Sequence, residues 1–222
     1  QGADIDMDEA KGITKADGIF TVKGERADYQ AKSVILATGS KHRTLGLHGE
    51  DKFTGEGISY CAVCDGAFYK DMDIAVIGGG NSALQEAILL SKTSKSVTVI
   101  QNLPFLTGES KLIEQLEATD NIRVILSSVV AKILGEDKFE GITVKNEESG
   151  EETDLSFDGI FVAIGQKPEN ENFSSSVNLD ERGYITANES CIPNGEAGIF
   201  VAGDCRSKAV RQIATAISDG AV

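Results

Sequence analysis

The sequence predicts an α/β protein with two Rossmann-like, three-layer domains, one inserted into the other. Short buried strands alternate with amphipathic helices between residues 73 and 126, and a glycine-rich turn joins the first of these strands to its helix. Further buried strands that end in glycine lie well before and well after this block. We assign residues 58–170 to the inserted domain and residues 1–57 with 171–222 to the other.

The composition is that of a globular protein and excludes several functional classes. Of the 222 residues, 41% are hydrophobic and 25% are charged, which is ordinary for a packed domain. The formal net charge of −14 disfavours nucleic acid or an anionic membrane as a partner. No apolar run approaches the roughly 18–20 residues of a membrane helix, and from the polar start we expect no signal peptide. We expect a cytoplasmic protein.

The amino-terminal part is predicted to contain few regular elements. Residues 19–23 alternate as a short strand. Residues 33–39 form an apolar run that ends in Ala-Thr-Gly39, as in a buried strand. Residues 41–57 are polar and rich in glycine, so we expect a loop.

The middle of the chain shows the clearest alternation of strands and helices. Strands are expected at 73–77, 96–100 and 122–126, and helices at 83–91 and 110–117. Residues 128–157 alternate around turn signals and predict an antiparallel meander. The remaining predicted elements are a buried strand at 158–165 that ends in Gly165, a short strand at 183–186, a buried strand at 198–204 and a helix at 209–222.

The first chemical motif is the turn Gly78-x-Gly80-x-x-Ala83, between a strand and a helix. The first glycine permits the tight turn, and the second lets backbone amides approach a pyrophosphate at the helix N-terminus. The small third residue lets helix and strand pack closely. We interpret the turn, with Asn81 and Ser82, as a dinucleotide site. A glycine-rich turn without a ligand is the alternative.

The end of the next strand favours NADH over NADPH. An acidic residue at this position typically binds the ribose 2′-hydroxyl, whereas arginines accept a 2′-phosphate. Here Gln101 is followed by Asn-Leu-Pro, and no Arg or Lys occurs before Lys111. Gln101 can hydrogen-bond a ribose hydroxyl, so NADH is the preferred hypothesis.

The second motif is the cysteine pair Cys61-x-x-Cys64, followed by Asp65. Such pairs close small disulfides and exchange with substrate disulfides. The adjacent carboxylate could take and return the proton that thiol chemistry moves. The alternatives are half of a metal site or two inert thiols, but no second ligand pair is present. Cys191 and Cys205 have no such pattern and are interpreted as small buried residues.

The third motif is Gly203-Asp204, which follows a buried strand. An aspartate at the carboxyl end of a sheet can bind a sugar or ribityl hydroxyl. A turn or helix-capping role is equally compatible with these residues alone. Arg211 and Gln212, on the helix expected next, could reach a cofactor or lie on a solvated face.

The order of these motifs resembles the low-molecular-weight thioredoxin reductases and the related flavoprotein subunit of alkyl hydroperoxide reductase. The resemblance covers essentially the whole chain. It implies an FAD enzyme that passes electrons from NAD(P)H through flavin to Cys61–Cys64 and on to thioredoxin or a thioredoxin-like protein. By analogy Cys64 faces the flavin, Cys61 exchanges with the partner and Asp65 is the acid/base. The implied cofactor-binding residues outside the glycine turn are Gly39, Gln101, Gly165, Gly203, Asp204, Arg211, Gln212 and Ile213.

The resemblance also implies a homodimer and shows two departures. The family's His-Arg-Arg run, which binds the NADPH phosphate, is replaced by Gln101-Asn-Leu. The family's opening FAD fingerprint has no counterpart before residue 33, so we expect an internal fragment whose parent protein binds FAD. Alternatives are an NADH-dependent electron donor of peroxide reduction, a ferredoxin-linked reductase, and a nucleotide-binding module without turnover.

Overall fold

The computed structural model describes residues 2–222 and divides into two compact units. The central unit is His42–Gly165, and the split unit comprises the chain up to Lys41 together with Gln166–Val222. The two chain segments at the division, β5 (Ser40–His42) and β14 (Gln166–Pro168), pair with each other. The division precedes residue 58, the boundary expected from sequence, because residues 43–57 pack on the central unit, where Phe53 joins the core.

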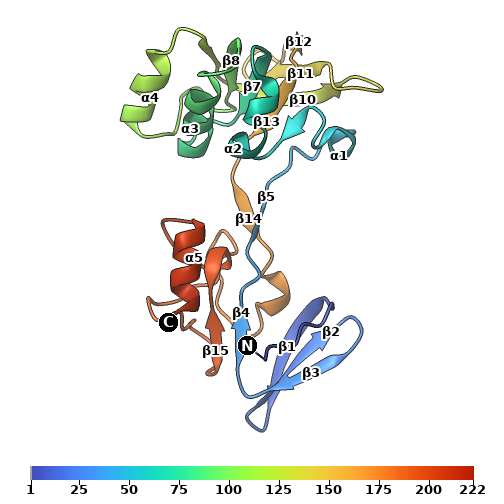
Figure 1. The fold of residues 1–222 in the computed structure, drawn as a ribbon, viewed down its shortest axis with the longest axis vertical. Coiled ribbons are helices and arrows are strands. Elements are labelled where there is room, and N and C mark those ends of the chain that lie inside the picture. The colour runs from blue at the N-terminus through green and yellow to red at the C-terminus, as the bar shows by residue number, and fades with distance from the viewer. Residues whose placement is uncertain (1) are drawn as a thin grey trace. The chain divides into compact units, whose positions relative to one another are not determined.

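A five-stranded sheet forms the middle of the central unit, with strand order β6-β13-β7-β8-β9 (Figure 1). All neighbouring strands are parallel, as expected for a Rossmann-like sheet. The strands predicted at 73–77 and 96–100 are confirmed. The bounds are β6 Ile58–Ser59, β7 Asp73–Ile77, β8 Ser96–Ile100, β9 Ile122–Ile125 and β13 Gly159–Val162.

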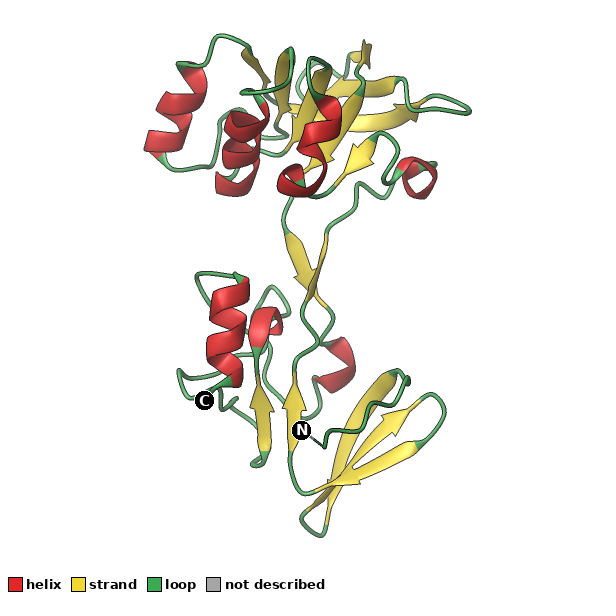
Figure 2. Ribbon diagram, in the orientation of Figure 1, coloured by secondary structure: helices red, strands yellow, loops and turns green. Residues whose placement is uncertain are grey.

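The alternation of side chains along β7 separates the two faces of this sheet. Ile74 and Val76 point into a core shared with α3 (Asn81–Leu90) and α4 (Ser110–Glu117). Ala75 and Ile77 point into a second core. That core is covered by an antiparallel sheet of β10 (Ser128–Leu134), β11 (Gly141–Asn146) and β12 (Glu152–Ser156). The three layers, visible in Figure 2, confirm the predicted meander and helices.

Three short helices absent from the sequence predictions lie before, within and after the cysteine segment. They are α1 (Glu50–Phe53), α2 (Ala62–Asp65) and the 3-10 helix η1 (Gly66–Tyr69). Each spans only four residues, too short for a 3.6-residue periodicity to be seen. The expectation of a loop over residues 41–57 is therefore wrong for α1.

The split unit is built around two small sheets. An antiparallel sheet comprises β1 (Ala10–Ala16), β2 (Ile19–Gly24) and β3 (Asp28–Ala31), and β4 (Val34–Leu36) pairs in parallel with β15 (Ile199–Val201). Its remaining elements are η2 (Glu171–Phe173), η3 (Gly203–Cys205) and α5 (Ile213–Gly220). A core that includes Phe20, Leu36 and Val201 holds these elements together.

Two predicted elements of the split unit are corrected by the structure. Residues 183–186 form no strand, because Ile185 makes only isolated bridges, to Leu179 and Arg206. The last helix begins at Ile213 rather than at 209, because Gln212 and Thr215 form a capping box that fixes its start. Arg211 and Gln212 therefore precede the helix on which they were expected.

Across residues 2–222, no helix has the length and apolar character needed to cross a membrane. The same residues contain no group of three or more His, Cys, Asp or Glu that could hold a metal ion.

Candidate functional site

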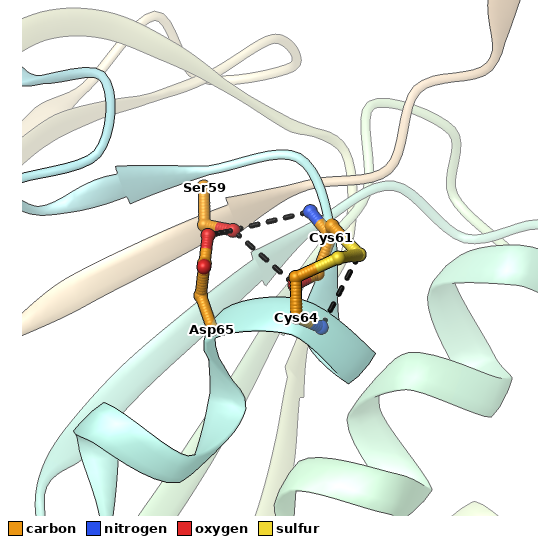
Figure 3. The surroundings of a disulfide bond; sticks show 4 residues. All are labelled: Ser59, Cys61, Cys64 and Asp65. Carbon is orange, nitrogen blue, oxygen red and sulfur yellow. Dashed lines mark hydrogen bonds between the residues drawn. A yellow bond between two sulfur atoms is a disulfide. The ribbon is translucent and has the colours of Figure 1, made fainter.

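The cysteine pair of the central unit forms a disulfide, Cys61–Cys64, at the start of α2 (Figure 3). The two Cα atoms are 5.3 Å apart, within the range of disulfides. Strand β6 and the single residue after it, Tyr60, lead from the sheet directly into Cys61. Cys64 is exposed and Cys61 is half-buried, so the bond is accessible from the surface of this unit.

Ser59 and Asp65 join the two ends of the cysteine segment (Figure 3). The hydroxyl of Ser59, a buried residue, donates to Asp65 Oδ2 at 2.6 Å and accepts the Cys61 amide at 3.1 Å. Asp65 is thus connected to the backbone of Cys61 through a single hydroxyl. The site prediction did not include Ser59, although a serine two residues before the first cysteine was visible in the sequence.

The sulfur of Cys61 also receives a hydrogen bond. The backbone N–H of Cys64 donates to Cys61 Sγ at 3.2 Å, because Cys61 is the N-cap of α2. A backbone N–H at the start of a helix can stabilise negative charge on a nearby sulfur. In this site the sulfur that faces such a donor is that of Cys61.

A buried carboxylate fixes the segment that leads to the cysteines. Glu50 accepts the backbone amides of Leu45 and Gly46 at 2.7 and 2.8 Å and the Tyr60 hydroxyl at 2.6 Å. Burial, together with the Glu50 carboxylate, raises the pKa of Tyr60 above its usual range. Tyr60 immediately precedes Cys61, so Glu50 helps to fix the backbone from which Cys61 projects.

The glycine-rich turn between β7 and α3 has the strained backbone that its sequence predicts. Gly78 has φ 129°, and a Cβ atom there would lie 2.5 Å from the Ala163 carbonyl oxygen. Gly80 is different, because its φ is −87° and its hypothetical Cβ has 3.7 Å to the nearest neighbour, Thr107. The fold itself requires glycine at position 78. At position 80 a side chain would fit, so the space beside Gly80 is open to a ligand. Ala83 is fully buried beneath the turn.

The segment after β8 folds across this turn. The Thr107 amide donates to the Gly79 carbonyl at 2.8 Å. The Asn81 side chain accepts the Glu109 amide at 2.7 Å and donates to its carboxylate at 3.0 Å. Gln101, expected to reach a ribose hydroxyl, is 5% exposed and packs under Gly79. Ser82, in the first turn of α3, is exposed.

The Gly-Asp motif of the split unit lies in η3, at the carboxyl end of β15. Gly203 has φ 82°, which favours glycine. Asp204 Oδ1 is buried and makes no hydrogen bond within the described structure. The Arg211 guanidinium stacks 3.8 Å above the Tyr184 ring, and its Nε is likewise buried without a hydrogen bond among the described residues. Two buried polar atoms of this region are therefore available for an external partner.

Asp219, on α5, is the most highly connected charge of this region, and the site prediction did not include it. Its carboxylate accepts the Gly203 amide at 2.9 Å, two hydrogen bonds from Arg206 at 2.6 and 2.9 Å, and one from Lys208 at 2.9 Å. Arg206, followed by Lys208, holds the pKa of Asp219 well below its usual range. No local sequence pattern connects Asp219 with residues so far before it.

A second residue that was missed, Asn170, links three segments of the split unit. Its amide donates to the carbonyls of Gly183 and Cys205 at 2.9 and 2.8 Å and accepts the Thr38 hydroxyl at 2.9 Å. Asn170 is fully buried. Asn170 thereby connects Thr38, which precedes the predicted site residue Gly39, with Cys205, which follows the predicted site residue Asp204.

The predicted site residues thus form two groups. The central unit holds Cys61, Cys64 and Asp65 together with the glycine turn, Gln101 and Gly165. The split unit holds Gly39, Gly203, Asp204, Arg211, Gln212 and Ile213. Gly39 and Gly165 adopt positive φ, and Ile213 is 82% exposed. Cys191 and Cys205, predicted to be small buried residues, are free and buried.

The chain is similar to several known proteins. A family profile described as pyridine nucleotide-disulphide oxidoreductase matches residues 1–220. A thioredoxin reductase of Streptomyces coelicolor is 39% identical over 220 residues, 99% of this chain and 68% of its own length. A 34.2 kDa protein from the rubredoxin operon of Clostridium pasteurianum is 38% identical, over 98% of this chain and 71% of its own length. The crystal structure of Lactococcus lactis thioredoxin reductase superposes with a TM-score of 0.80 at 38% identity, over 96% of this chain and 71% of its own.

Proposed function

The chain belongs to the pyridine nucleotide-disulphide oxidoreductase family, among its low-molecular-weight thioredoxin reductases, and on this premise we propose that it is an FAD-dependent disulfide reductase. Electrons from a nicotinamide nucleotide reduce the Cys61–Cys64 disulfide, and the resulting dithiol reduces a disulfide of thioredoxin or a thioredoxin-like protein. The observation that carries the proposal is the accessible disulfide, with Asp65 connected to the backbone amide of Cys61 through the Ser59 hydroxyl.

The cysteines have unequal roles in this proposal. The Cys64 amide 3.2 Å from Cys61 Sγ supports Cys61 as the thiolate that attacks the partner's disulfide. Cys64 then closes the disulfide and releases the reduced partner. Asp65, hydrogen-bonded to Ser59, is proposed to hold and return the proton exchanged by the thiols. Two electrons and two protons are delivered per disulfide reduced.

The split unit is proposed to bind FAD. Its fit rests on two buried polar atoms that have no hydrogen bond in the described structure, Asp204 Oδ1 and Arg211 Nε. An aspartate carboxylate suits a ribityl or ribose hydroxyl, and an arginine suits a phosphate or a ring carbonyl. Flavin, when bound, transfers a hydride equivalent between nucleotide and disulfide. Gly39, Gly203, Gln212 and Ile213 are proposed to line the same site.

The central unit is proposed to bind NADH at the turn from Gly78 to Ala83. The open side of Gly80 and the amides of Asn81 and Ser82 would receive the pyrophosphate. NADH is favoured because no Lys or Arg lies between the end of β8 and Lys111 to pair with a 2′-phosphate. Glu109, held at Asn81, adds a negative charge that opposes a further phosphate.

We also propose a cytoplasmic homodimer. A reduced dithiol that works by exchange suits a reducing compartment, and the thioredoxin reductase relatives support thioredoxin as the partner.

The test is NADH-dependent reduction of a thioredoxin disulfide by the FAD-supplemented protein. Cys61→Ser and Cys64→Ser are each expected to abolish disulfide turnover, because neither variant can form the internal disulfide. Glu152→Gln, which alters an exposed side chain on the antiparallel sheet of the central unit, serves as the control and is expected to keep its turnover.

Three results would contradict the proposal. Full turnover in either pair variant would remove the dithiol from the electron path. A protein that binds NADH but takes up no flavin and reduces no disulfide would be a nucleotide-binding module. A rate with NADPH above that with NADH would overturn the nucleotide assignment.

A further inference from the structure

Three buried charges of the split unit form one network around Asp219. The side chains of Arg206, Lys208 and Asp219 are 13%, 8% and 6% exposed. Arg206 makes two hydrogen bonds to the Asp219 carboxylate, and Lys208 makes a third at 2.9 Å. Charges so deeply buried are costly unless each is paired, so the position of Asp219 decides where the two cations lie.

Lys208 lies between two carboxylates and pairs closely with only one. Its Nζ is 2.9 Å from Asp219 Oδ2 but 3.8 Å from Asp204 Oδ1, which is beyond hydrogen-bonding distance. The same Asp204 atom is buried and has no hydrogen bond in the described structure. A small movement of Lys208 would close this gap and occupy the free acceptor of Asp204.

Asp219 also fixes the turn on which Asp204 lies. Its Oδ2 atom accepts the amide of Gly203 at 2.9 Å. Gly203 is held at φ 82°, a conformation that a flexible turn would readily leave. The Asp219 carboxylate therefore fixes both the backbone of Gly203, just before Asp204, and the position of Lys208, the cation nearest to Asp204.

We infer that Asp219 is a positioning residue for the flavin site: it holds Lys208 away from Asp204 and thereby keeps Asp204 Oδ1 free to accept a cofactor hydroxyl. The inference rests on the proposed binding of FAD by the split unit. Without Asp219, Lys208 would turn to the nearest remaining carboxylate, Asp204, because a buried ammonium requires an acceptor. FAD would then have to displace an ion pair in order to bind.

The test is FAD affinity, measured by quenching of flavin fluorescence in the full chain. Asp219→Asn, which keeps the shape but loses the charge, is expected to weaken binding roughly tenfold, the effect of one hydrogen bond to a charged group. Lys208→Met alone is expected to bind FAD like the wild type. Adding Lys208→Met to Asp219→Asn is expected to recover most of the affinity, since the competing cation is gone.

A crystal structure of the Asp219→Asn chain without flavin supplies a second readout. It is expected to show Lys208 Nζ within hydrogen-bonding distance of Asp204 Oδ1. Glu196→Gln removes a different carboxylate of the same unit, paired with Lys15, and is the matched control expected to leave FAD affinity unchanged.

The possible failures are separable. Unchanged affinity in Asp219→Asn, a loss of affinity in Lys208→Met alone, or no recovery in the double variant would each overturn the role of Asp219. A wild-type chain that takes up no FAD would overturn the proposed flavin site and with it the purpose given to Asp219. The position of Lys208 in the variant structure would still report whether Asp219 controls it.

Discussion

The two units hold their candidate sites in opposite ways. In the central unit the disulfide, Ser59 and Asp65 lie within seven consecutive residues and are joined by short-range hydrogen bonds. In the split unit the residues on either side of Asp204, Gly203 and Cys205, are hydrogen-bonded to side chains distant in sequence, those of Asp219 and Asn170. The first site is organised by neighbouring residues, and the second by buried polar groups brought together by folding.

This difference indicates how each site should respond to mutation. A site made of sequence neighbours keeps its geometry as long as its short segment stays in place, so its substitutions should act mainly on chemistry. A site fixed by buried polar groups depends on every partner being satisfied, so its substitutions should act on stability as well. The following predictions test this contrast.

The largest effect is expected from Asn170→Ala in the split unit. The variant would leave the Gly183 and Cys205 carbonyls and the Thr38 hydroxyl without their buried partner. We expect a loss of about 3 kcal/mol in the free energy of unfolding of this unit. Urea unfolding followed by amide hydrogen exchange would measure each unit separately.

Asn121→Ala is the matched control in the central unit, because the Asn121 amide also donates to two carbonyls but is only half-buried. Its expected cost is about 1 kcal/mol. Equal losses for the two asparagines would contradict the contrast between the units.

The next largest effect is expected from Asp65→Asn in the central unit. This variant should change the rate of disulfide reduction rather than the free energy of unfolding. An amide cannot take up the proton, so disulfide turnover should fall roughly a hundredfold while unfolding remains unchanged. Ser59→Ala breaks the same hydrogen bond but keeps the carboxylate, and we expect it to cost less than tenfold. If Ser59→Ala were the slower variant, positioning by Ser59 would outweigh proton transfer by Asp65.

A smaller effect concerns Glu86, a charge that the central unit buries without a partner. Burial raises the pKa of Glu86 to about 7, and its Oε2 has no hydrogen bond among the described residues. Between about pH 4.5 and 7 the unfolded chain loses this proton before the folded chain does, so stability falls as pH rises. Glu86→Gln should therefore stabilise the unit by about 1 kcal/mol at pH 8, allowing for its partial exposure.

The measurement is urea unfolding at pH 4 and pH 8, with Glu114→Gln, an exposed position on α4, as the control. At pH 4 the wild type and Glu86→Gln should be equally stable. A variant that loses stability at pH 8 would mean that the Glu86 carboxylate supports the fold.

The smallest effect is expected from Glu152→Gln, on the antiparallel sheet of the central unit. Its partner Lys132 is 3.0 Å away, but the two side chains are 44% and 64% exposed. Exposed ion pairs contribute little, so the free energy of unfolding should change by less than about 0.5 kcal/mol. A loss above 1 kcal/mol in thermal or urea unfolding would show that charge pairs matter in the central unit as well.

The same contrast explains what could be predicted from sequence. The strands and helices from 73 to 126, the glycine turn and the disulfide depend on periodicity and short spacing, which are visible in a sequence. Asp219 and Asn170 depend on contacts over 11 or more positions, for which a single sequence has no signal. The sequence predicts that Gln101 reaches a ribose hydroxyl, but its burial against Gly79 follows from the fold of the later segment.

The pairing of β5 with β14 has a further consequence, for the history and engineering of the chain. Adjacent paired strands lie about 5 Å apart, so the central unit leaves the split unit and returns to it at neighbouring points. The two ends of the split unit at which the central unit is inserted are therefore close together. Inserting a whole domain between such ends costs the split unit little chain entropy. The β5–β14 pair therefore marks the place where the central unit could be exchanged for the corresponding unit of a related protein, or replaced by a short turn.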